Sequence, residues 1–114
     1  MTKQYSYFRF DGDLDSSRSF IENAIGCPLS ERDSSYWGGT YYLLKDAASG
    51  FRLQLHGNVD HTGEWINDEF PGALVLCELS GPMEMVATFV AKIAGAGGVL
   101  LASETLEIDE IGDE

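Results

Sequence analysis

The order of hydrophobic patterns along the 114 residues constrains the fold more than any other feature of the sequence. Two stretches, 14–25 and 82–94, carry apolar residues at helical spacing. Alternating or continuously apolar stretches, which are typical of strands, surround them at 5–10, 36–45, 51–56, 73–79 and 99–102. Helices separated by a meander of strands predict an α+β fold, with two helices on one face of a mainly antiparallel sheet of about five strands. The order strand, helix, three strands, helix, strand is a variant of the ferredoxin-like plan.

Local signals mark the ends of both predicted helices. Asp13 or Asp15 can cap the first helix, and Gly26 fits the position just beyond its end. Pro28 prevents the helix from continuing. Pro82 fits the first position of the second helix, because its missing N–H would have no partner there.

Two further segments are predicted to lack regular structure. Residues 29–35 are expected to form a loop, and the polar segment 57–72 is the longest stretch without clear periodicity. Long loops of this kind in compact domains are often functional. Residues 1–103 are therefore predicted to form a single α+β domain, followed by an acidic tail at 104–114.

The charge balance excludes several classes of function. There are 19 acidic residues against 7 basic ones, a formal net charge of −12 at pH 7. Nucleic-acid binding needs clustered Lys and Arg for the phosphates, and anionic membrane surfaces also attract basic segments. The sequence opens without an apolar signal-like stretch, and its two cysteines, Cys27 and Cys77, are expected to be reduced. These features predict a cytoplasmic protein.

The acidic residues concentrate in the first turn, in segment 57–72 and in the tail, where they can reach a partner without the cost of burial. One interpretation is that they only keep the protein soluble. The other is that they meet a basic protein, with Trp65 and Phe70 as aromatic anchors and the acids as a steering rim. An alternative for Trp65 is a core aromatic that holds the loop down. The predicted contact residues are Asp60, Glu64, Trp65, Asp68 and Glu69, followed by Asp11, Asp13 and Asp15.

Candidate catalytic and metal sites are weak. His56, Asp60 and His61 lie close in sequence, but no third metal ligand has suitable spacing, and solvated histidines are the favoured interpretation. The run Asp11–Asp15 resembles a calcium loop without the later Gly and bidentate Glu, which favours a turn followed by a helix cap. We therefore expect no enzyme activity, no metal and no cofactor.

The sheet face that the helices leave open offers an alternative function. Tyr5, Tyr7, Arg9, Arg52 and His56 are predicted to lie there, which makes this face aromatic and locally basic. Such a face would suit a small anionic ligand, as a small-molecule-binding or regulatory domain would use it. It could instead mediate homodimerisation.

The stretches SSYWGGTYYLL and GEWINDEFPGALVLCEL, in a small, strongly acidic α+β chain, resemble the immunity proteins of bacterial contact-dependent inhibition and other polymorphic toxin systems. The resemblance implies a tight one-to-one complex with a cognate toxin domain, often a basic nuclease, inside the producing cell. It assigns no functional residue by position. On this basis the sequence predicts an inhibitor that binds and neutralises a toxin domain through acidic loops.

Overall fold

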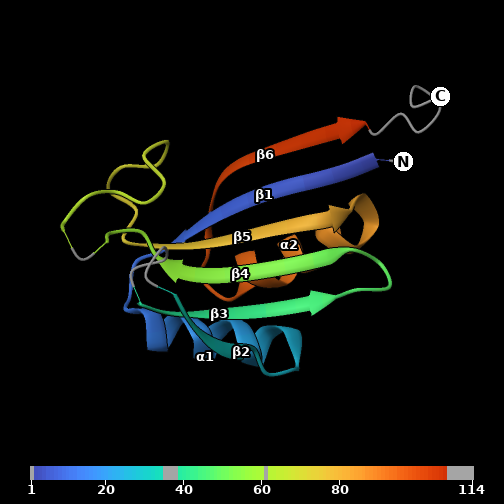
Figure 1. Cartoon of the computed structure of the whole chain (residues 1–114). Helices are drawn as coiled ribbons and strands as arrows, with labels where there is room; N and C mark the ends of the chain where they lie inside the picture. The colour runs from blue at the N-terminus through green and yellow to red at the C-terminus, as the bar shows by residue number, and fades with distance from the viewer. Residues whose placement is uncertain (1, 35–38, 61, 108–114) are drawn as a thin grey trace.

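The computed structural model describes residues 2–34, 39–60 and 62–107, which form a six-stranded antiparallel sheet and two helices (Figure 1). The strands lie side by side in the order β2-β3-β4-β5-β1-β6. The elements are β1 (Thr2–Phe10), α1 (Leu14–Ile25), β2 (Ser30–Ser34), β3 (Gly39–Asp46), β4 (Phe51–Gly57), β5 (Val75–Pro82), α2 (Met83–Gly95) and β6 (Val99–Glu107).

The predicted α+β class is confirmed, but the strand count and order differ from the prediction. Segment 29–35, expected to be a loop, contains β2, a polar strand at the edge of the described sheet, where it pairs with β3. Its sequence SERDS lacks the alternation of apolar and polar residues that would predict a strand, and charged residues are common on edge strands. The order also differs in detail from a ferredoxin-like plan, because three strands, β5, β4 and β3, lie between β1 and β2, the strands that α1 joins. One split β-α-β unit is present, since β5 and β6 run in the same direction around β1 and α2 joins them.

The predicted helix ends agree closely with the structure. Asp13 is the N-cap of α1, and its Oδ1 accepts a hydrogen bond of 2.7 Å from the backbone N–H of Ser16. Gly26 ends the helix in the left-handed conformation, with φ 79°, and its N–H donates to the carbonyl of Glu22. The second helix begins at Met83, one residue after the predicted position of Pro82.

The C-terminal strand is longer than the sequence suggested. Strand β6 continues to Glu107, so residues 104–107 of the predicted tail belong to the sheet. Their pairing with β1, Glu104 opposite Tyr5 and Leu106 opposite Lys3, extends the ladder to Thr2, the first residue of that strand. Residues 108–114 and the predicted strand start at 36–38 lie outside the described residues.

The hydrophobic core lies between the sheet and the two helices. Phe8, Cys77 and Leu55 are register neighbours on three adjacent strands, and all three are fully buried. They pack in one cluster with Ile21 of α1 and Ile93 of α2. Burying a side chain of this size contributes roughly 1.5–3 kcal/mol. Both helices therefore cover the same sheet face, as predicted. No helix of the described residues covers the opposite face, called here the open sheet face, although His56 and Leu76 on it are fully buried.

Neither helix in the described part of the chain has the length and apolar character needed to cross a membrane.

Candidate functional site

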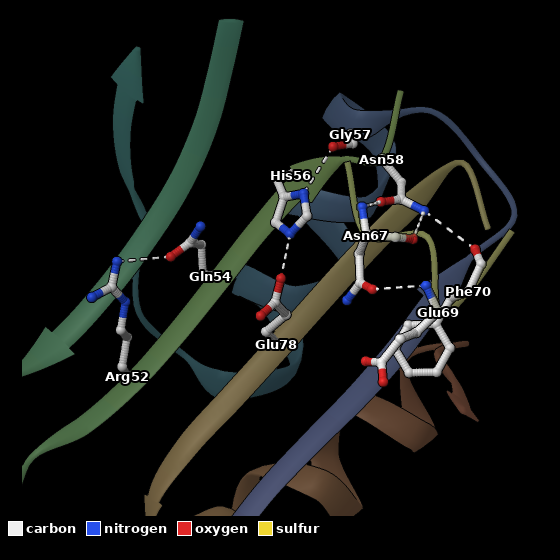
Figure 2. Close-up of polar contacts among 9 residues, drawn as sticks. All are labelled: Arg52, Gln54, His56, Gly57, Asn58, Asn67, Glu69, Phe70 and Glu78. Atoms are coloured by element: carbon white, nitrogen blue, oxygen red, sulfur yellow. Dashed lines mark hydrogen bonds and ion pairs between the residues drawn. The ribbon is translucent and has the colours of Figure 1, made fainter. Parts of the chain in front are cut away.

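The segment between β4 and β5, residues 58–74, is called here the acidic loop; the structure describes it apart from residue 61. Its first residue, Asn58, is fully buried, and Figure 2 shows the polar contacts of its side chain. The Asn58 side-chain amide donates to the carbonyls of Asn67 and Phe70, both at 3.2 Å, and its Oδ1 accepts from the Asn67 N–H at 2.7 Å. Its backbone N–H donates to the carbonyl of Leu74 and its carbonyl accepts from the N–H of Ile66. Asn58 thus ties the second half of the loop, residues 66–74, to the end of β4.

Asp60 organises the outer half of the acidic loop. Its Oδ1 accepts hydrogen bonds from the N–H and hydroxyl of Thr62, at 2.8 and 2.6 Å, and from the N–H of Glu64 at 3.0 Å. Val59 and Trp65 form a β-bridge across the base of this turn. The predicted contact residue Asp60 therefore shapes the loop.

The remaining predicted contact residues of the acidic loop are exposed. Glu64, Asp68 and Glu69 all project from the surface, and 37% of Trp65 is accessible. Trp65 is outside the hydrophobic core cluster, so the alternative of a core aromatic is wrong. The described part of the loop presents three carboxylates and one indole ring at the surface.

Phe70 differs from its predicted role as a second anchor for a partner. Its ring packs against Tyr7 on the open sheet face, with the ring centroids 5.3 Å apart. The residue is half-buried, and its carbonyl accepts from Asn58. Phe70 thus fastens the acidic loop to the sheet.

The acids of the first turn each have a partner within the chain. Asp11 contacts the guanidinium of Arg9, and Asp13 caps α1. Asp15 accepts from the Tyr42 hydroxyl at 3.2 Å. All three aspartates remain exposed, so a second protein can still reach them. Asp13 and Asp15 line an open groove of about 540 Å³, whose other lining residues are Leu14, Glu31, Thr40 and Tyr42.

Two of these contacts change the acidity of the groups involved. The hydrogen bond from Ser16 lowers the pKa of the Asp13 carboxyl, because it favours the charged form. Burial raises the pKa of the Tyr42 phenol, and the hydrogen bond to Asp15 adds to that effect. Asp13 therefore stays charged in moderately acidic solution.

Both acidic segments lie at one end of the sheet. Phe10, the last residue of β1, pairs with Val75, and Gly57 at the end of β4 pairs with Val75 from the other side. The first acidic turn and the acidic loop therefore begin at neighbouring strand ends, although about 50 residues of sequence separate them (Figure 1). The predicted contact residues thus come from two segments that the fold brings to the same end of the sheet.

His56 corrects the expectation of solvated histidines. Its side chain is fully buried, and Nε2 lies 2.6 Å from Oε2 of Glu78 on the adjacent strand β5 (Figure 2). Its Nδ1 lies 2.8 Å from the carbonyl oxygen of Gly57. The neighbouring candidate His61 is outside the described residues. His56 is thus held within the sheet and is not presented to solvent as a base.

Residues with thiol or metal-binding chemistry form no cluster in the described part of the chain. No three His, Cys, Asp or Glu residues there lie together as metal ligands. Cys77 is fully buried in the core, and burial raises the pKa of its thiol. A buried, protonated thiol is a poor nucleophile.

Comparison with known proteins finds neither a family model nor a curated protein that matches this chain.

Proposed function

We propose that this protein is an inhibitor that binds a basic protein domain through its acidic loop, and that the partner is a cognate toxin domain of the kind that immunity proteins neutralise. The observation that carries the proposal is the hydrogen bonding within the acidic loop, in which buried Asn58 holds Asn67 and Phe70, and Asp60 holds Glu64. Glu64, Trp65, Asp68 and Glu69 lie exposed on this loop. A loop that is already ordered loses little conformational entropy when it binds.

The chemistry of this surface suits a basic partner. Exposed carboxylates attract Lys and Arg and speed encounter, while a partly exposed Trp supplies apolar contact area that charges lack. The acids of the first turn lie at the same end of the sheet as the acidic loop. A partner that spans both segments therefore meets carboxylates from each. The formal net charge of −12 adds a long-range attraction that acts before contact.

Inhibition in this proposal requires no catalysis by the inhibitor. Carboxylates set on a rigid loop can occupy the positions that a nuclease keeps for substrate phosphates, or can cover a neighbouring surface. The protein would then act by occupancy alone, with one inhibitor bound to one toxin domain.

Co-expression with the toxin domain encoded beside its gene tests the proposal. We expect the intact chain to protect the cells and to co-purify with the toxin domain in a one-to-one complex. The variant Asp68→Lys/Glu69→Lys should lose protection. The control Glu84→Lys/Glu104→Lys makes the same charge change at exposed acids outside the acidic loop, and it should retain protection. If the intact chain forms no complex and gives no protection, the proposal is wrong.

A further inference from the structure

The open sheet face contains a second feature: two adjoining cavities, together called here the basic hollow, which extend from Tyr7, the contact of Phe70 in the acidic loop, toward the opposite end of the sheet. The smaller, of about 130 Å³, is lined by Tyr5, Tyr7, Arg52, Gln54, Glu78, Leu79 and Ser80. The larger, of about 320 Å³, shares Arg52 and Ser80 with it and adds mainly Lys3, Lys45 and Asp46. The short Ser80 side chain lies between longer neighbours, since the register places it beside Tyr5 on one strand and Arg52 on the other.

The basic hollow gathers cations in a strongly acidic protein. Lys3, Lys45 and Arg52 are three of the chain's seven basic residues. Arg52 stands directly opposite Lys45 in the β3–β4 pairing, and like charges in that position destabilise a sheet. Within the part of the chain that the structure describes, none of the three forms an ion pair. An anion bound between them would relieve this repulsion.

Gln54 supplies an independent observation. Its side chain is 95% buried, with only 5% exposed, and its Oε1 accepts a hydrogen bond of 2.8 Å from Nη2 of Arg52 (Figure 2). That bond fixes which end of the amide is oxygen, because an NH₂ group could not accept from a guanidinium. The opposite end, Nε2, is buried and has no hydrogen-bond partner among the described residues. A buried donor without an acceptor is costly, and a bound acceptor oxygen would remove that cost.

We propose that the basic hollow binds a small organic anion through a carboxylate group. The guanidinium of Arg52 donates to the carboxylate in a planar fork. Gln54 keeps its hydrogen bond from Arg52, and its unpartnered Nε2 donates to the same group. The rings of Tyr5 and Tyr7 flank the carbon atoms, and Lys3 and Lys45 lie where a second negative group of the ligand would reach.

The acids in the hollow limit which anion fits. Glu78 lies in the smaller cavity, where its Oε2 faces His56 at 2.6 Å, and Asp46 lies in the larger one. With one cation and one carboxylate lining it, the smaller cavity favours a singly charged planar group over a phosphate dianion. A cavity of about 130 Å³ also excludes drug-sized ligands, whose sites span roughly 300–1,000 Å³.

An NMR titration of the ¹⁵N-labelled full-length protein tests this site, at constant ionic strength and with succinate, acetate, acetamide and inorganic phosphate as probes. We expect succinate and acetate to shift the Gln54 side-chain amide and the backbone amides of Tyr5, Arg52 and Ser80, with succinate binding more tightly. Acetamide and phosphate should shift them at least tenfold less at equal concentration. Equal binding of phosphate, or no saturable shift with any carboxylate, would overturn the proposal.

Variants separate a specific site from general anion attraction. Arg52→Gln should weaken succinate binding at least tenfold, and so should Lys45→Gln, which changes an exposed residue and leaves the core intact. Arg32→Gln removes the same charge from the exposed edge strand β2 and should leave binding unchanged. If all three variants weaken binding equally, the site does not exist as proposed. No residue of the basic hollow belongs to the acidic loop, although Tyr7 contacts Phe70, and the variants that test this site change neither the loop nor that ring contact.

Discussion

His56 and Glu78 form a polar pair across β4 and β5, in which a fully buried imidazole nitrogen lies 2.6 Å from a carboxylate that is 29% exposed. The pair lies on the open sheet face, where His56 is close to the start of the acidic loop in sequence. Glu78 lines the smaller cavity of the basic hollow. Removing Glu78 would leave the buried imidazole without this partner. We expect Glu78→Ala to destabilise the fold by about 1–3 kcal/mol, measured as a lower urea midpoint.

Glu104→Ala is the matched control for that change, because Glu104 is an exposed acid on β6. It should change stability by less than about 0.5 kcal/mol. Equal effects of the two substitutions would show that the His56–Glu78 pair contributes nothing of its own.

Asn58 is predicted to control the order of the acidic loop. Asn58→Ala deletes three side-chain hydrogen bonds and leaves the carbonyls of Asn67 and Phe70 without this donor. We expect a loss of about 1–3 kcal/mol in stability and faster amide hydrogen exchange at residues 62–70. Asn23→Ala changes an exposed asparagine of α1 and should leave exchange in the loop unaltered. Unchanged exchange in Asn58→Ala would contradict the anchoring role.

Asp13 should make part of the stability depend on pH. Its folded pKa lies below the unfolded value because the charged carboxylate accepts from Ser16, so its contribution is fully present above the unfolded pKa, near 3.8. The contribution disappears as the pH falls through the lower folded pKa. Asp13→Asn keeps a good capping side chain but cannot titrate. The urea midpoint should therefore fall less steeply between pH 7 and pH 2 in Asp13→Asn than in the parent chain. If the midpoints of both proteins fall equally steeply, ionisation of Asp13 does not contribute to the pH dependence of stability.

The two cysteines should differ in reactivity. Cys77 is fully buried and its thiol pKa is raised, whereas Cys27 is partly accessible just beyond α1. Under native conditions we expect an aromatic disulfide reagent to modify Cys27 first, with Cys77 reacting only after unfolding. The variant Cys27→Ser should then show almost no rapid reaction. Rapid modification of Cys77 in that variant would be inconsistent with the buried position.

Local signals predicted the elements whose sequence determines them directly. The Asp13 cap, Gly26 at the helix end and the alternation of Phe51, Leu53 and Leu55 each act within a few residues, so the sequence alone reveals them. Strand β2 escaped prediction because its polar residues pair at an edge, where no apolar face is required.

The candidate sites depend on pairings between distant residues, which the sequence does not display. His56 was expected to be solvated because its partner Glu78 lies 22 residues away on another strand. The buried position of Asn58 could not be predicted, because nothing in the sequence distinguishes this asparagine from the other polar residues of the segment. The acidic contact residues were predicted from charge alone, and the shared sheet end of the first turn and the acidic loop follows only from the register at Val75.

The association rate of the charge-reversal variants with the toxin domain tests the central claim most directly. At low salt, Asp68→Lys/Glu69→Lys should associate about tenfold more slowly than the parent chain, and the difference should shrink as salt screens exposed charges beyond roughly 10 Å. The control Glu84→Lys/Glu104→Lys has the same net charge, and its association rate should fall much less. If both variants associate at the same rate, the acidic loop is not the surface that meets the partner, and the account of this protein as an acidic-loop inhibitor is wrong.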